Sequence, residues 1–130
     1  MTELQLWQSI ASLNCVEGLT AAVNDAREYG GDWECVFRSK TKCEIVRLGR
    51  YWDSDNGYEQ RAAALLIVDA IEAAKLGRFH RIGRRWHFEF ALGVNRWIYS
   101  EDLDVPDDQY EHLSLLTVIE RVLREIKEGK

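Results

Sequence analysis

One turn and the two runs that flank it constrain the fold of this chain more than any other feature. The dipeptide Gly83-Arg84 joins residues 79–82 to residues 85–90, in which polar and apolar side chains alternate. Alternation with a period of two is typical of a β-strand with one buried face. Glycine at the first central position favours a type II′ turn, which matches the twist of paired strands. The pattern therefore predicts a β-hairpin.

The turn also sets the register of this hairpin, and the register assigns each side chain to one face of the sheet. His80 lies opposite His87, and Arg78 lies opposite Glu89, so these four residues share a face. The other face carries the aromatic side chains, which are Phe79, Trp86, Phe88 and Phe90. We expect the aromatic face to pack in the core.

Periodicity and turn signals place the remaining elements. Apolar residues at helical spacing predict four helices, at residues 3–13, 16–29, 58–76 and from about residue 110 onward. Alternation predicts a further hairpin and a short strand, at residues 33–38 and 43–48 and at residues 97–99. We therefore predict a single α+β domain over residues 1–130, in which a mostly antiparallel sheet of two hairpins packs against helices.

The helix at residues 16–29 is predicted from its two ends and one apolar stripe. Asn14 stands three residues before Glu17, which is the spacing of a capping box at a helix N-terminus. The stripe that follows consists of Val16, Leu19, Val23 and Ala26. Gly30 and Gly31 come next and favour a helix C-terminus. In the same way, Gly77 is predicted to end the helix at residues 58–76.

An internal repeat is a further hypothesis. The offset that aligns Tyr58 with Tyr110 also pairs Ile67 with Ile119, as a duplication of hairpin, acidic loop and helix would. Amphipathic helices share such matches by default, so chance similarity is the alternative.

The layout of the first two thirds of the chain resembles a known family. Its parts are a helix at residues 16–29, a hairpin at 33–48 with Trp33 in a strand, and an alanine-rich helix at 58–74. In these features the chain is similar to the phage ABA-sandwich domains, small proteins found in phage and prophage genomes. The resemblance implies a phage or prophage origin. That family has no agreed activity or catalytic residues, so the resemblance assigns no role to any residue of this chain.

Composition indicates a soluble globular protein. Of the 130 residues 46% are hydrophobic, and the longest apolar stretches are too short to span a bilayer. We expect no signal peptide, because no basic start precedes an apolar run. Three cysteines without paired spacing fit a reducing compartment, where we expect them to act as small buried apolar residues. These observations predict a cytoplasmic protein without membrane association.

Charge is distributed unevenly along a chain whose net charge is −5. Residues 33–50 hold five basic and two acidic residues, and residues 78–99 hold five basic and one acidic residue. The predicted strands are therefore basic and the predicted helices acidic. A basic sheet face would attract a polyanion or an acidic protein, although charged strands also keep a protein soluble. The candidate binding residues on this face are Arg78, Arg81, Arg85, Arg96 and Trp97.

Aromatic and basic residues are interleaved near the second hairpin. Arg81 lies opposite Trp86, and Trp97 and Tyr99 follow close by in the sequence. Such a mixture stacks on the bases of single-stranded nucleic acid and neutralises its phosphates. Cation–π packing within the fold is the alternative interpretation.

Two acidic loops offer the hard oxygen ligands that Ca²⁺ prefers. The candidate ligands are Asp53, Asp55, Glu59, Asp102, Asp104, Asp107 and Asp108. Carboxylates before a helix also stabilise its N-terminus without any metal. The pair His80 and His87 with Glu89 forms a second candidate set, which Arg78 disfavours because it would neutralise the carboxylate.

No nucleophile-base motif, phosphate loop or closed metal motif is present in the sequence. We therefore expect a non-enzymatic domain that binds a protein partner by charge complementarity and needs no cofactor. Nucleic-acid binding by the basic sheet face and Ca²⁺ binding by the acidic loops are the alternatives.

Overall fold

The structure, a computed structural model, describes residues 3–24, 33–48, 58–93, 96–100 and 107–129. Their order is helix, three strands, helix, three strands, helix. The helices are α1 (Glu3–Leu13), α2 (Tyr58–Ala73) and α3 (Asp107–Lys127). The strands are β1 (Thr20–Asn24), β2 (Trp33–Arg38), β3 (Cys43–Leu48), β4 (Gly77–Ile82), β5 (Arg85–Phe90) and β6 (Trp97–Tyr99). The predicted α+β class is confirmed, and the repeat remains a prediction.

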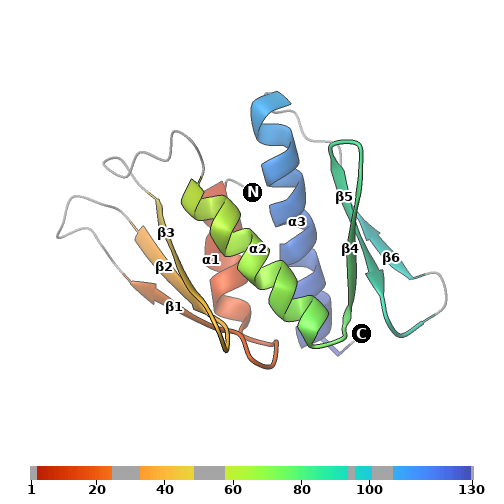
Figure 1. The fold of residues 1–130 in the computed structure, drawn as a ribbon, viewed down its shortest axis with the longest axis horizontal. Coiled ribbons are helices and arrows are strands. Elements are labelled where there is room, and N and C mark those ends of the chain that lie inside the picture. The colour runs from red at the N-terminus through yellow and green to blue at the C-terminus, as the bar shows by residue number, and fades with distance from the viewer. Residues whose placement is uncertain (1–2, 25–32, 49–57, 94–95, 101–106, 130) are drawn as a thin grey trace.

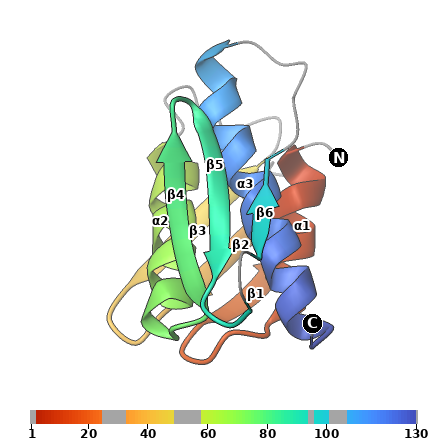
Figure 2. The same cartoon turned by 90° about the vertical axis from the view of Figure 1, so that its right-hand side faces the viewer.

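The helices form a layer between two antiparallel sheets, each with three strands (Figure 1). Sheet A has the order β1-β2-β3 and packs against α1 and α2. Sheet B has the order β4-β5-β6 and packs against α2 and α3, and α3 also contacts α1. The two predicted hairpins therefore belong to separate sheets. Each sheet has an outer face that no helix of the described residues covers (Figure 2).

The core is built from the inner faces of both sheets and from the helices between them. Trp7 of α1 is fully buried and lies with its ring centroid 5.5 Å from that of Phe37 in sheet A. On the other side, Phe88 is buried between Phe79 and Phe90, at centroid distances of 4.8 and 5.0 Å. The predicted aromatic face of the second hairpin therefore lies in the core.

The turn at Gly83 has the geometry that the sequence predicts. Gly83 has a φ of +64°, whereas Arg84 has no positive φ, as a type II′ turn requires. The strands pair in the predicted register, with Ile82 opposite Arg85 and His80 opposite His87. Local turn chemistry alone thus fixes which side chains share each face of β4 and β5.

The predicted helix at residues 16–29 is wrong, because residues 20–24 form strand β1. Gly18 has a φ of +82°, which interrupts any helix that starts at Asn14. Asn14 also does not cap a helix: its side-chain oxygen accepts a hydrogen bond from the Ala21 amide at 3.0 Å. Ala21 pairs with Phe37, and both lie on the inner face of sheet A. Residues 25–32, with the predicted end of that helix, lie outside the described residues.

Helix α2 ends before the predicted glycine. Lys75 takes the left-handed conformation, with a φ of +58°, and its amide donates to the Glu72 carbonyl at 3.0 Å. The Leu76 amide donates to the Ile71 carbonyl at 3.4 Å, which completes a Schellman motif. Gly77 is instead the first residue of β4.

Buried polar contacts connect α1 to α3. The Ser9 hydroxyl donates to Glu120 Oε1 at 2.9 Å, and Arg124 of the same helix donates to Glu120 Oε2 at 2.9 Å. Glu120 is only 4% exposed, so these two donors replace its water. His112 and Glu3 form a second contact between the helices.

Removal of this buried carboxylate should loosen the contact between α1 and α3. We expect Glu120→Ala to lower the free energy of unfolding by about 1–3 kcal/mol, because the Ser9 hydroxyl loses its acceptor. Urea unfolding of Glu120→Ala, Ser9→Ala and the double variant measures the effect. The double variant should lose less than the sum of the single losses, and strict additivity would contradict the contact.

Candidate functional site

The outer face of sheet B carries four aromatic side chains, of which Tyr99 is exposed and His80, His87 and Trp97 are partly exposed. Because side chains alternate along a strand, every second residue of each strand points away from the helices. The outer face of sheet B consists of Arg78, His80, Ile82, Arg85, His87, Glu89, Trp97 and Tyr99. Figure 2 views the molecule toward this sheet.

Four of these residues form a continuous aromatic ladder across the three strands. The ring of His80 lies 5.3 Å from that of Trp97, and Trp97 stacks on Tyr99 with 21° between the ring planes. Tyr99 in turn meets His87 at 4.8 Å in an edge contact. Each ring is therefore held by a neighbour before any partner arrives, although Tyr99 remains 56% exposed.

Charged groups border the aromatic ladder. Arg78 pairs with Glu89 in the strand register, and Arg85 lies across from Ile82 beside the turn. His80 Nε2 lies 3.7 Å from Glu89 Oε1, which is too long for a hydrogen bond. With two arginines and one carboxylate, the outer face of sheet B is mildly basic.

The structure divides the five predicted binding residues. Arg78, Arg85 and Trp97 lie on the outer face, but Arg81 does not. Arg81 points to the inner side and makes two contacts of 2.9 Å with the carboxylate of Glu111 in α3. The grouping of Arg81 with the outer residues is therefore wrong, since its side chain lies on the other face and its guanidinium pairs with Glu111.

Arg96 is also occupied on the inner side of the sheet. Its guanidinium donates to Glu125 of α3 at 3.0 Å and lies 4.3 Å from the centroid of the Phe90 ring. This arrangement agrees with the cation–π alternative and removes Arg96 from the predicted basic face.

Sequence reasoning missed His80 and His87 as members of a binding surface, and it placed Tyr99 only near Arg81, not beside His87. The signal that unites them is the pairing of β6 with β5, in which His87 lies opposite Tyr99 and Glu89 opposite Trp97. A strand of three residues has no turn signal that would set this register from sequence.

The predicted calcium ligands are mostly outside the described residues. Asp53, Asp55, Asp102 and Asp104 are not described, and Asp107 and Asp108 are placed only as the start of α3. Glu59 is described, and it accepts a hydrogen bond from Arg47 at 2.9 Å. Within the described residues, no three histidine, cysteine, aspartate or glutamate side chains are arranged to hold a metal, and this includes His80, His87 and Glu89.

The three cysteines differ in environment, although all are free thiols. Cys35 is fully buried, and this burial, reinforced by the Glu34 charge, raises the pKa of its thiol to about 12. Burial also raises the pKa of Cys15, which donates to the Leu123 carbonyl. Cys43 is exposed, so the prediction of a buried apolar role is wrong for this residue.

Comparisons with protein-family models, curated proteins and solved structures found no match to this chain. Among the described residues, none of the helices combines the length and the apolar character that a membrane span requires.

Proposed function

We propose that this protein is a non-enzymatic binding domain and that a protein partner docks on the outer face of sheet B. The aromatic ladder carries the proposal, because it sets the partly exposed Trp97 and the exposed Tyr99 beside arginines. Trp, Tyr and Arg are the side chains that dominate binding energy at protein interfaces. The ring contacts of His80, Trp97 and Tyr99 order these side chains in advance, which lowers the entropy lost on binding.

The charges of this face define the chemistry of the partner. Arg78 and Arg85 exceed the single carboxylate of Glu89. A partner that fits would place an apolar side chain against Trp97 and Tyr99 and acidic side chains toward the arginines. Such charge complementarity sets orientation and association rate more than affinity. We also propose a phage or prophage origin, which the family resemblance implies.

Nucleic acid is the second candidate, favoured by the arginines beside the partly exposed rings of the ladder. A single strand binds by stacking its bases on open aromatic faces. Here Trp97 and Tyr99 cover one face of each other, and His80 tilts against the indole. The net charge of −5 also opposes a polyanion. These two observations favour a protein partner.

Photocrosslinking from the outer face of sheet B tests the proposal. A photoreactive amino acid at Ile82, which is 62% exposed on the same face, should give a discrete adduct in an extract of the source cells. Leu65 on α2, 53% exposed, provides the matched control position. Trp97→Ala or Tyr99→Ala should weaken this capture by about thirtyfold, the effect of an interface hot spot, while circular dichroism shows a folded protein.

Two outcomes would contradict a protein partner at this face. One is equal labelling from Ile82 and Leu65, and the other is capture that Trp97→Ala leaves unchanged. Oligonucleotide binding across a salt series separates the second candidate. Tight binding that falls steeply with salt and is lost in Arg78→Gln, Arg85→Gln would establish nucleic acid instead.

A further inference from the structure

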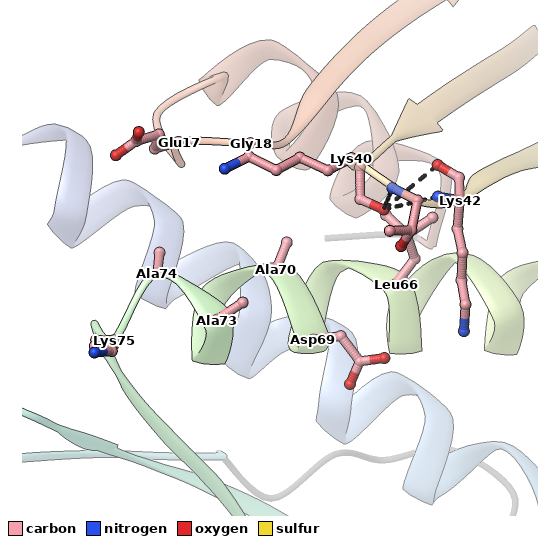
Figure 3. Close-up of a pocket in the computed structure, with 12 residues that line it drawn as sticks. Glu17, Gly18, Lys40, Lys42, Leu66, Asp69, Ala70, Ala73, Ala74 and Lys75 are labelled. Atoms are coloured by element: carbon pink, nitrogen blue, oxygen red, sulfur yellow. Dashed lines mark hydrogen bonds between the residues drawn. The ribbon is translucent and has the colours of Figure 1, made fainter.

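A cavity of about 590 Å³ lies on the other side of the molecule, between α2 and two loops of the sheet A half (Figure 3). The second half of α2 forms one wall. Glu17 and Gly18, which precede β1, and residues 39–42, which connect β2 to β3, form the other. None of these residues belongs to the outer face of sheet B, so the cavity is independent of the proposed docking face.

The walls of the cavity are apolar in the middle. Leu66, Ala70 and Ala73 of α2 and the following Ala74 line it, and Figure 3 shows the alanine methyl groups on the side that faces Lys40. The aliphatic stem of Lys40 runs along the opposite wall and passes over Gly18. A Cβ atom at Gly18 would lie 3.3 Å from Lys40 Cε, so glycine leaves room for this stem.

Three lysines line the cavity around this apolar strip, and their ammonium groups point in different directions (Figure 3). Lys40, Lys42 and Lys75 line the cavity, and the chain has only two other lysines, Lys127 and Lys130. The described ion pairs include none of the three, nor the two acidic lining residues Glu17 and Asp69. By contrast, several arginines elsewhere are paired with carboxylates, as in Arg47 with Glu59, Arg81 with Glu111 and Arg96 with Glu125.

The backbone groups near these lysines find their hydrogen-bond partners without the lysine ammonium groups. The Schellman motif at Lys75 satisfies the carbonyls of Ile71 and Glu72. In the β2–β3 connection, the Ser39 hydroxyl accepts from the Thr41 and Lys42 amides, at 3.4 and 3.1 Å. The ammonium groups are thus available to an anion in a cavity large enough for a small ligand.

We propose that this cavity binds a small phosphate monoester with an apolar or aromatic body, of about the size of a nucleoside monophosphate. The phosphate would take the ammonium groups of Lys40 and Lys42, exposed side chains of one connection that can rotate toward it and bind it as point charges. The body would lie on the alanine strip of α2. Asp69 would accept a hydrogen bond from a hydroxyl or amino group of the ligand. Three cations against two carboxylates favour a dianionic phosphate over a neutral ligand.

Titration of isotope-labelled protein with adenosine 5′-monophosphate, followed by NMR, tests this site. Adenosine and inorganic phosphate supply the two halves of the probe separately, and each should bind at least tenfold more weakly. The shifted amides should cluster at Gly18, residues 39–42 and the end of α2. Lys40→Gln and Lys42→Gln should each weaken binding about tenfold, as expected for a lost bond to a charged group.

Lys127→Gln is the matched control, because Lys127 lies in the last turn of α3 and does not line the cavity. A second variant, Ala73→Phe, fills the cavity without a change in charge and should abolish binding. Thermal melting shows whether each variant is folded, and the exposed lysine variants keep the test valid if Ala73→Phe is not.

Three results would overturn the proposal. They are the absence of shifts at millimolar nucleotide, equal weakening by Lys40→Gln and Lys127→Gln, and equal affinity for inorganic phosphate and the nucleotide. The last result would mean an ion site without a place for an organic body.

Discussion

Gly77→Ala should lower the free energy of unfolding by about 3 kcal/mol or more, the upper range for overpacking a core. A Cβ atom at this position would lie 2.2 Å from the Glu89 carbonyl oxygen and 2.4 Å from Phe88 Cζ. The first neighbour is backbone of the paired strand, and the second is a fully buried ring. Neither can move without opening the start of β4.

Gly83→Ala in the same hairpin is the matched control. Gly83 has a positive φ of +64°, but a Cβ atom there would meet nothing within 4 Å. Its cost should therefore be the conformational strain alone, about 1–2 kcal/mol. Urea unfolding of both variants measures the difference, and equal losses would show that the close approach at Gly77 is not what requires glycine.

The second large effect should appear in alkaline solution. The Cys35 thiol has a pKa of about 12 in the folded protein and an ordinary value of 9.0 when exposed. Between these values the unfolded chain loses the proton while the folded chain keeps it. The contribution of the protonated Cys35 thiol to the free energy of unfolding is complete below pH 9.0. Above that pH it decreases by about 1.4 kcal/mol per pH unit.

Urea unfolding from pH 8 to pH 11 measures this effect, with two controls. Cys35→Val removes the thiol. Between pH 8 and pH 11 its free energy of unfolding should fall by about 2 kcal/mol less than that of the wild type. Cys43→Ser changes an exposed thiol and should leave the difference in place. A wild-type curve that coincides with that of Cys35→Val would refute the buried, protonated thiol.

Local chemistry explains why the hairpins could be predicted. Gly83-Arg84 determines a turn type, and the turn fixes the register of β4 against β5 without any distant contact. Strand β1 shows the opposite case. The four-residue spacing of Leu19 and Val23 fits helical and strand periods alike. The deciding features are the conformation of Gly18 and the partner strand β2.

The candidate site was only partly predictable for a similar reason. Alternation places Arg78 and Arg85 on one face, as the structure confirms. It does not reveal that Glu111, 30 residues away in the sequence, neutralises Arg81. Nor does it reveal how β6 pairs, so the contact between Tyr99 and His87 could not be predicted. Both contacts depend on tertiary packing.

The central position of the helices determines how cooperatively the two sheets unfold. Sheet A is covered by α1 and α2, and sheet B by α2 and α3, so α2 belongs to the cover of both. Glu72 near its end accepts the Phe79 amide of β4 at 3.1 Å, which anchors sheet B to the same helix. A fragment that ends after sheet A, or one that begins at sheet B, would lack α2 and expose apolar surface. Because both sheets depend on α2, they should unfold together. Amide protons in both sheets should therefore exchange with solvent through one common opening.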